Sequence, residues 1–459
     1  MLRLWQKDCV KLAKQKFHHG QRHFLAQATP GAGKTIMAAT LAEQMFAEKK
    51  IDFVLCFAPS TSVSRGIRDT FSRILDCSFK GKIGEKGKVV TYQSLRFFDR
   101  RFWVALSKYK VLCIFDEIHH CCGNSEGNCN SWGYHVLTDI QTAATYTLAL
   151  SGTPWRSNDT PVALASYSTP DGRIVCDYNY SMAHAIRDKV CRKPTIALID
   201  CEQLTVGDKT HTESFNSLSH FLSSDNFSYQ SILNDDDALE YILSKSVDKL
   251  KVIREETHDA AGLVVASSIK HALKISRKLE IDFQQSVVVV THKNKKSHNI
   301  INGFNESDTK WIVSVGMISE GTDIPRLQVC CYLTNVKTEL YFRQVLGRIL
   351  RLTQGSNQEA WFYTFSTPKM VEFAEDIESE IPQSCMYLKM SPAIDSSTHD
   401  SISTLSNPIE SKTTQELSDI IWKGGIKDIL QTSKSDQSHT CLLSLNEFNQ
   451  RVIEAFREL

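Results

Sequence analysis

A short stretch near the N-terminus has the residue types and the setting of a phosphate-binding loop. It follows an apolar run, precedes a stretch of helical composition, and reads Ala28-Thr29-Pro30-Gly31-Ala32-Gly33-Lys34-Thr35. Glycine there lets backbone N–H groups surround a phosphate, and the positive end of the following helix adds attraction. Lys34 would reach the β- and γ-phosphates, and the Thr35 hydroxyl would bind Mg²⁺. An ordinary glycine-rich turn is the alternative, because the strict pattern has Gly where this chain has Ala28.

A pair of carboxylates follows another apolar run and would complete a site for nucleotide hydrolysis. Asp116 and Glu117 come directly after residues 111–115, so a strand would deliver both to the carboxyl edge of a sheet, where α/β folds bind ligands. Asp116 would hold the magnesium, and Glu117 would polarise the attacking water. His119 would sense the γ-phosphate or bond a neighbouring motif. The alternative is the start of an ordinary loop.

Two further polar stretches also follow apolar runs. The stretch Ser151-Gly152-Thr153-Pro154 offers hydroxyls that would hydrogen-bond the Asp116 and His119 region. Residues 319–325 would bring Gly321 and Asp323 to a carboxyl edge of a second sheet. Turns with these residue types are common, so neither stretch identifies a site alone.

Three polar side chains recur at helical spacing in the last third of the chain. Gln344, Arg348 and Arg351 are four and three residues apart, which predicts that they share one face of a helix. Surface charge is the ordinary interpretation. The other interpretation is a pair of arginine fingers, delivered from a second domain to the γ-phosphate.

The elements that must position these residues alternate between strands and helices. Apolar runs suited to strands lie at 23–27, 53–58, 89–92, 111–115 and 146–150, and again at 262–266, 287–291, 311–315, 329–333 and 360–365. Helical stretches, among them 4–19 and 36–47, lie between these runs. The alternation predicts an α/β fold with two parallel sheets, each covered by helices on both faces.

Composition limits the class of protein. The chain has 459 residues, of which 42% are hydrophobic and 23% charged, so the bulk is expected to fold. Its apolar stretches are far shorter than the roughly 18 residues of a membrane span, its N-terminus lacks the apolar core of a signal peptide, and no membrane partner is expected. Fourteen cysteines without disulfide-like spacing favour a reducing, cytoplasmic location.

Charge is distributed unevenly along the chain. The first 110 residues contain 21 Lys and Arg against 8 Asp and Glu, whereas the formal net charge of the whole chain is +1. A basic first quarter suits a surface that contacts phosphates. A solvated basic face is the plain alternative.

In this order, the motifs resemble those of superfamily 2 helicases and translocases. Residues 28–35 match motif I, 116–119 motif II, 151–154 motif III, 319–325 motif V and 344–351 motif VI. The stretches Asp116-Glu117-Ile118-His119-His120-Cys121 and Ser151-Gly152-Thr153-Pro154-Trp155-Arg156 resemble the stand-alone bacterial DEAD/DEAH-type group related to Res subunits of type III restriction enzymes. The resemblance covers residues 1–385. It implies two tandem RecA-like domains, with ATP and Mg²⁺ in the cleft between them and nucleic acid, DNA rather than RNA, across their tops.

The resemblance also implies roles for further residues. Gln6 would contact adenine, and the loop residues with Gly321 and Asp323 would contact the nucleotide. Nucleic-acid contacts would come from residues at strand ends, namely Pro59, Ser60, Thr61, Thr91, Gln93, Ser267 and Thr291. A Ser or Thr at a strand end is otherwise a turn residue.

The expected division of the chain has five parts. Residues 1–170 form the first RecA-like domain, 171–258 a connector with a surface excursion at about 202–240, and 259–385 the second domain. A Ser/Thr-rich linker (386–415) and a helical tail (416–459, with helices at 416–430 and 444–458) follow.

Three alternatives remain open at this point. An ATP-gated clamp or sensor would bind nucleic acid without moving along it. A subunit of a restriction or phage-defence assembly would need a partner such as a nuclease. A zinc site at His119, His120, Cys121, Cys122 and Cys129 fits tetrahedral spacing poorly.

Overall fold

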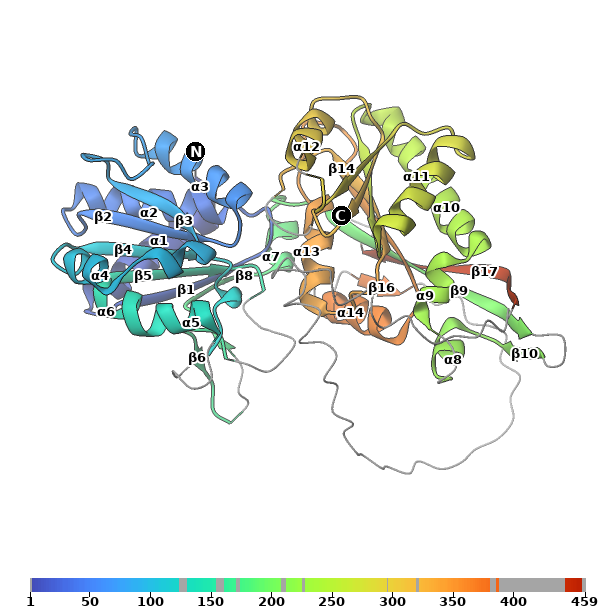
Figure 1. Ribbon diagram of the computed structural model, residues 1–459, viewed down its shortest axis with the longest axis horizontal. Helices are drawn as coiled ribbons and strands as arrows, with labels where there is room; N and C mark the ends of the chain where they lie inside the picture. The colour runs from blue at the N-terminus through green and yellow to red at the C-terminus, as the bar shows by residue number, and fades with distance from the viewer. Residues whose placement is uncertain are drawn as a thin grey trace.

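The computed structural model has two α/β domains side by side (Figure 1). It describes residues 2–123, 130–153, 161–170, 174–207, 212–224, 228–294, 296–318, 322–379, 385–387 and 442–455. Trp155, Arg156, Gly321, Cys129 and the predicted helix at 416–430 lie outside these ranges. Of the helices in these ranges, none is long and apolar enough to cross a membrane.

The first domain is built on a parallel sheet with strand order β3-β2-β4-β5-β1-β8. Its strands are β1 (His23–Ala28), β2 (Phe53–Ala58), β3 (Gly87–Thr91), β4 (Val111–Asp116), β5 (Tyr146–Ser151) and β8 (Tyr178–Tyr180). Five of them were predicted within two residues at each end, because fully buried parallel strands form continuous apolar runs. The short strand β8 was not predicted.

Helices cover both faces of this sheet. One face carries α1 (Leu4–His18), α2 (Lys34–Ala47) and α3 (Thr61–Ile74), and the other carries η1 (Tyr92–Phe97), α4 (Arg100–Leu106), α5 (Ser131–His135), η3 (Val136–Ile140) and α6 (Gln141–Ala143). A small hairpin of β6 (Ser166–Tyr167) and β7 (Ile174–Val175) and the helix α7 (Met182–Arg187) lead toward the second domain.

The second domain has a larger, mixed sheet in the order β12-β13-β11-β14-β15-β9-β17-β16. The strands in chain order are β9 (Lys193–Gly207), β10 (Thr212–Phe215), β11 (Ala261–Ala266), β12 (Val287–Thr291), β13 (Trp311–Val315), β14 (Leu327–Leu333), β15 (Glu359–Phe365), β16 (Cys385–Tyr387) and β17 (Leu442–Ala455). The strands from β11 to β15 were predicted, and β9 pairs with β15 in parallel.

The helices of the second domain form one layer on each face of its sheet. One layer holds α8 (Leu218–Leu222), α9 (Tyr229–Asn234), α10 (Asp236–Glu256) and α11 (Ile269–Ile281), and the other holds α12 (Ser297–Asn305), α13 (Glu339–Ile349) and α14 (Pro368–Ser379). The prediction of a surface excursion at 202–240 was wrong, because Leu218, Phe221 and Ile232 in this segment are buried in the core.

The predicted helix at 444–458 was also wrong. Its described residues, 444–455, belong to β17, which pairs antiparallel with β9 from Leu442 to Glu454. Strand β9 is fifteen residues long, and β15 and β10 pair with one of its edges, so its opposite edge offers unpaired backbone groups that a distant strand can satisfy. Pairing in the folded molecule therefore outweighs local composition.

Candidate active site

The phosphate-binding loop joins β1 to α2, as predicted, and faces the second domain. Gly31 and Gly33 have φ of 80° and 93°, a left-handed conformation that glycine adopts without strain. Thr29 is buried, and Lys34 and Thr35 form the first turn of α2. Backbone N–H groups at the start of this helix are therefore available to an anion.

Two side chains of the first helix hold this loop in place. Arg3 Nη1 donates to the carbonyl oxygens of Gly31 (3.3 Å) and Ala32 (2.7 Å), and Gln6 Nε2 donates to Gly33 O at 2.9 Å. Gln6 Oε1 also accepts from the Arg3 backbone N–H. The contact of Gln6 with adenine stays a prediction, and Arg3 is a residue that sequence reasoning missed. Its only signal was its place at the start of the helix beside Gln6.

Lys34 links the loop to the carboxylate motif. Its Nζ donates to Ala28 O at 3.1 Å and lies 3.4 Å from Glu117 Oε1. The Lys34 side chain is only 10% exposed, and that of Glu117 is 22% exposed. The Lys34 ammonium group thus contacts a carbonyl oxygen and a carboxylate oxygen. A negatively charged phosphate oxygen could take the place of the carboxylate when a nucleotide binds.

Glu117 has a strained backbone. It follows β4 with φ 51° and ψ 56°, the left-handed region, which costs a non-glycine residue on the order of 1–3 kcal/mol. This turn into η2 (Ile118–His120) points the Glu117 carboxylate back toward Lys34 and the end of β5. Strain of this kind persists only where surrounding contacts hold it, and it concentrates at functional sites.

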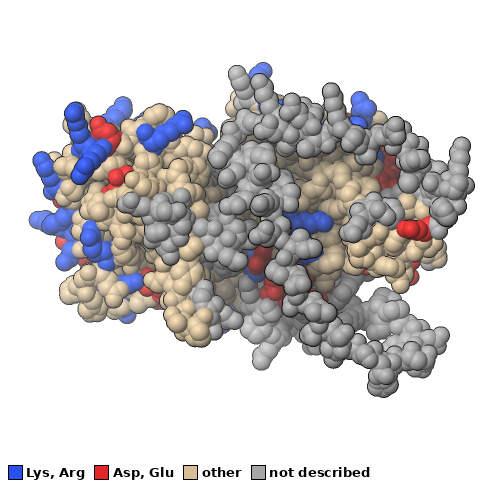
Figure 2. All heavy atoms as spheres, turned by 60° about the horizontal axis from the view of Figure 1, so that its bottom comes forward, with Lys and Arg blue, Asp and Glu red and all other residues tan. Residues whose placement is uncertain are grey.

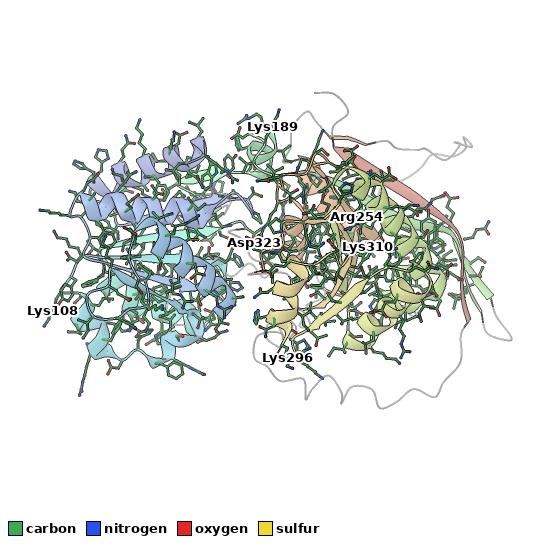
Figure 3. All side chains as sticks on the ribbon, turned by 90° about the horizontal axis from the view of Figure 1, so that it is seen from above. Lys108, Lys189, Arg254, Lys296, Lys310 and Asp323 are labelled. Carbon is green, nitrogen blue, oxygen red and sulfur yellow. The ribbon has the colours of Figure 1, made fainter. Side chains whose placement is uncertain are left out.

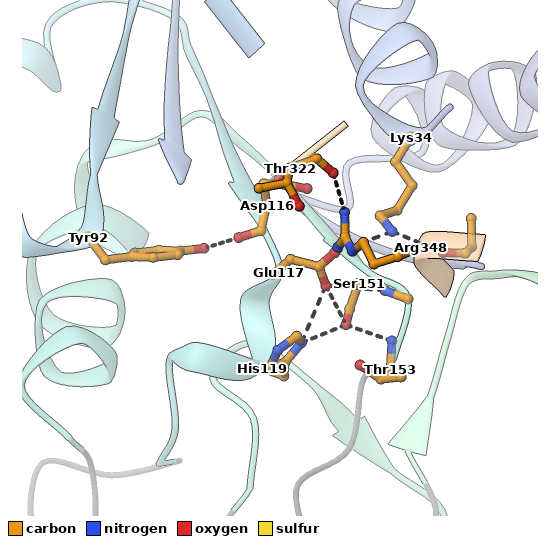
Figure 4. A network of polar contacts seen from close by, with 11 residues as sticks. Lys34, Tyr92, Asp116, Glu117, His119, Ser151, Thr153, Thr322 and Arg348 are labelled. Carbon is orange, nitrogen blue, oxygen red and sulfur yellow. Dashed lines mark hydrogen bonds and ion pairs between the residues drawn. The ribbon is translucent and has the colours of Figure 1, made fainter. Parts of the chain in front are cut away.

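A polar network connects motif II with the stretch after β5 (Figure 4). His119, fully buried, lies with Nδ1 2.9 Å from Ser151 Oγ, and Ser151 Oγ accepts from the Thr153 N–H at 3.0 Å. Glu117 Oε2 accepts from Ser151 Oγ at 3.4 Å and from Gly152 N at 3.3 Å. The predicted contact between these two stretches is present. A movement of the Glu117 carboxylate would therefore alter its hydrogen bonds to the loop that follows β5.

Asp116 is the last residue of β4, where the sequence placed it. Its backbone carbonyl accepts a hydrogen bond from the Tyr92 hydroxyl at 2.8 Å. Tyr92 is buried between the rings of Phe57 and Trp132, and burial raises the pKa of its hydroxyl, so it stays a donor at any ordinary pH. Sequence reasoning missed Tyr92, although its neighbours Thr91 and Gln93 were both predicted as site residues.

Helix α13 brings the second domain onto the phosphate-binding loop. A Cβ atom at Gly347 would lie 2.6 Å from Pro30 Cβ, so only glycine fits there. A Cβ atom at Gly31 would lie 3.4 Å from Arg351 Cγ. Gln344 is buried on the same helix. The structure therefore brings the predicted arginine motif and the lysine loop together.

The arginines are held by the loop before β14. Arg348 Nη1 donates to Thr322 O at 2.7 Å, and Arg351 forms an ion pair with Asp323. Figure 3 places Asp323 on the side of the second domain that faces the first. Burial lowers the pKa of Arg351 to about 10, so the guanidinium stays charged at neutral pH.

The prediction that Gln344, Arg348 and Arg351 share one helix was partly wrong. Helix α13 ends at Ile349, and Arg351 forms a β-bridge with Cys191 instead. A buried guanidinium explains this end: Arg192 Nη1 donates to Ile349 O at 3.2 Å and to Leu327 O at 2.7 Å. The bond to Ile349 O satisfies one of the carbonyl groups that lack a partner at the end of the helix, and the bond to Leu327 O ties this end to β14.

The predicted nucleic-acid contacts all lie at carboxyl ends of strands. Residues Pro59, Ser60 and Thr61 follow β2, Thr91 and Gln93 lie at the end of β3, Ser267 follows β11, and Thr291 ends β12. Several have local partners: Ser60 caps α3 through the Val63 N–H, and Ser267 Oγ lies 2.9 Å from His271 Nδ1. Gln93 is exposed. Their contact with nucleic acid stays a prediction.

Two family models match this chain. One, described as type III restriction enzyme, res subunit, matches residues 1–156, and the other, described as helicase conserved C-terminal domain, matches residues 244–353. The chain is therefore similar to superfamily 2 helicase-type proteins related to restriction-enzyme subunits. Both matched regions fall within the two α/β domains of the structure.

The relatives by sequence named here share less than 30% identity with this chain. An uncharacterized protein of Mycobacterium tuberculosis is 29% identical over 392 residues, covering 82% of this chain and 63% of that protein. One from Mycobacterium leprae is 28% identical over 395 residues, covering 83% and 64%. The chain thus spans less than two thirds of the length of these relatives. The DNA 3′-5′ translocase XPB2 of Sulfurisphaera tokodaii is 26% identical over 351 residues, covering 70% and 73%.

Two solved structures support the fold. A fragment of an HsdR subunit of a type I restriction enzyme from Vibrio vulnificus YJ016 has a TM-score of 0.55 at 17% identity, covering 81% of this chain and 65% of that one. The type ISP restriction-modification enzyme LlaBIII has a TM-score of 0.51 at 14% identity, covering 83% and 30%.

Proposed function

We propose that this protein hydrolyses ATP at the seam between its two domains and uses the cycle to move along nucleic acid, DNA rather than RNA. The observation that carries the proposal is the contact of Gly347 and Arg351 with the loop that ends in Lys34. A site made by two domains lets binding and hydrolysis change their separation.

The residues divide the chemical work among them. Lys34 and the loop N–H groups bind the triphosphate, while Thr35 and Asp116 would hold Mg²⁺, which neutralises phosphate charge when bound. Glu117 orients the attacking water, and His119 with Ser151 fixes the position of Glu117.

The arginines supply the last part of the site. In this structure Arg348 and Arg351 already lie at the seam, held by Thr322 and Asp323 of their own domain. DNA is favoured because the superfamily resemblance is to restriction-related proteins and because XPB2, a relative, is a DNA translocase.

The test is the rate of ATP hydrolysis without nucleic acid and with single-stranded DNA, duplex DNA or RNA. We expect at least tenfold stimulation, larger with DNA than with RNA. The Lys34→Ala variant should lose turnover under all four conditions, because Lys34 is the only charged residue in the sequence 28–35. Hydrolysis that persists in Lys34→Ala would show that the loop has been misassigned.

A clamp or sensor would behave differently from a motor. It would bind nucleic acid in an ATP-dependent way but displace neither a complementary strand nor a triplex-forming strand. Displacement of the triplex-forming strand alone would indicate translocation on duplex without unwinding.

A further inference from the structure

Lysines are concentrated at the amino-terminal ends of strands in the first sheet, on the side of the sheet opposite the phosphate-binding loop. Strands β3, β2 and β4 are parallel neighbours, so the loops that precede them meet at one edge. These loops, residues 75–86, 48–52 and 107–110, carry seven exposed lysines: Lys49, Lys50, Lys80, Lys82, Lys86, Lys108 and Lys110. We call this surface the lysine edge. Figure 2 shows Lys and Arg gathered at the end of the first domain that is turned away from the second, and Figure 3 places Lys108 there.

Backbone hydrogen bonds join the three loops into one surface. The Val54 N–H donates to Lys86 O at 2.9 Å, and the Asp52 N–H donates to Lys110 O at 2.7 Å. The Lys110 N–H donates in turn to Asp52 Oδ2 at 2.8 Å. The lysines therefore project from a fixed frame of neighbouring strands, so little backbone ordering would be required on binding.

The carboxylates of the same loops are outnumbered by these seven lysines, because the loops contain only Glu48, Asp52, Asp76 and Glu85. Glu48 pairs with Lys14, which lies on α1 and outside the lysine edge. Glu85 accepts from the Lys80 and Lys82 backbone N–H groups at 2.6 and 3.0 Å, and hydrogen bonds, that from Ser78 foremost, lower its pKa to about 2. Among the described residues, no ion pair joins a carboxylate to any lysine of the lysine edge. The outward charge is therefore positive.

We propose that the lysine edge is a second nucleic-acid-binding surface, which contacts the phosphate backbone of a duplex without reading sequence. Lysine binds phosphate as a point charge and needs no pocket. Protein–nucleic acid interfaces are strongly positive, whereas the cores of protein–protein interfaces are depleted in lysine. Large exposed apolar side chains here are few, Ile83 and Tyr109.

This surface is distinct from the seam. The strands that separate the two edges are five or six residues long, so the lysine edge lies on the order of 20 Å from the carboxyl ends that carry Asp116 and the expected nucleic-acid contacts. It also belongs wholly to one domain. It would keep nucleic acid bound while the seam opens, and the binding does not require that the proposed ATP hydrolysis be correct.

The test is the triple variant Lys49→Glu, Lys82→Glu and Lys108→Glu, with one change in each loop. The probe is a labelled 20-base-pair DNA duplex without nucleotide, measured by fluorescence anisotropy over a range of salt concentrations. The matched control is Lys189→Glu, Lys251→Glu and Lys310→Glu, which makes the same charge change elsewhere (Figure 3 labels Lys189 and Lys310).

We expect the lysine-edge variant to bind the duplex at least about tenfold more weakly near 0.1 M salt. We also expect the slope of log K against log salt to become less steep by about 2 to 3, since each phosphate contact contributes about 0.9 to its magnitude. The control should change affinity less than about threefold. Equal behaviour of the two variants would overturn the proposal. Competition by poly-glutamate as strong as that by duplex would also overturn it and favour an acidic protein partner.

A second measurement separates this proposal from the proposed function. ATP hydrolysis by the lysine-edge variant at saturating DNA should equal that of the unchanged protein. If the unchanged protein shows no hydrolysis, the proposed function fails, but the duplex-binding comparison still decides the lysine edge.

Discussion

Individual residues at the site are held by neighbours that are remote in sequence. Glu117 combines a left-handed backbone with hydrogen bonds from Ser151 and Gly152, so its carboxylate is fixed before any ligand binds. Such preorganisation avoids a reorganisation cost when charge develops in a transition state. Motif spacing could identify Glu117, Lys34 and Asp116, because their chemistry depends on residue type. It could not identify Arg3 or Tyr92, whose importance lies in the backbone carbonyls that they contact.

Arg3 gives the prediction at this scale. Arg3→Ala removes two hydrogen bonds to the phosphate-binding loop, each worth about 1 kcal/mol. Because the loop would then be less well ordered, we expect the KM for ATP to rise about three- to tenfold while kcat changes less than twofold. Steady-state kinetics would measure both. Lys7→Ala, an exposed change on the same helix, is the control and should match the unchanged protein. An unaltered KM in Arg3→Ala would contradict the role.

The strands were predicted best where the sequence has a compact run of apolar and β-branched residues. Strands β2, β12 and β13 agree with the expected runs to the residue, although β12 at the edge of its sheet is only partly buried. Prediction failed where distant pairing decides the structure, as for β17, and where a helix ends for tertiary reasons, as for α13. The end of α13 depends on Arg192, a buried side chain in a segment that was expected to be a connector.

Arg192 joins the end of helix α13 to the start of strand β14. Arg192 is 1% exposed, and its guanidinium donates to carbonyls of Pro325, Leu327 and Ile349. Arg192→Met would leave these buried carbonyl acceptors without their donor, so we expect the free energy of unfolding to fall by about 3 kcal/mol. Urea unfolding would measure the change.

Arg192→Lys separates charge from geometry. It keeps a positive charge but cannot reach several carbonyls at once, so it should recover less than half of the lost stability. Recovery of full stability with lysine would mean that charge alone matters. ATP hydrolysis should fall in both variants, since Arg351 follows the end that Arg192 fixes.

At the scale of the whole molecule, the two sheets and the seam between them explain why the motifs are spread over more than three hundred residues. In the described residues, motifs I, II and III lie at the carboxyl ends of β1, β4 and β5, and motif VI lies on α13 and just after it, against the loop of motif I. The order of motifs predicted this arrangement. It did not predict how the domains are joined, because β8 and α7 have no strong sequence signal.

In the proposed function, one triphosphate site is built from Lys34 in the first domain and from arginines in the second. The most direct test compares ATP binding and nucleic-acid-stimulated hydrolysis in Arg351→Ala with those in Arg277→Ala, an exposed arginine on α11 of the same domain. We expect Arg351→Ala to bind ATP within about threefold of the unchanged protein but to hydrolyse it on the order of 10³-fold more slowly, as expected for loss of an arginine finger. Arg277→Ala should be unaffected. Retention of full stimulated hydrolysis in Arg351→Ala would contradict the claim.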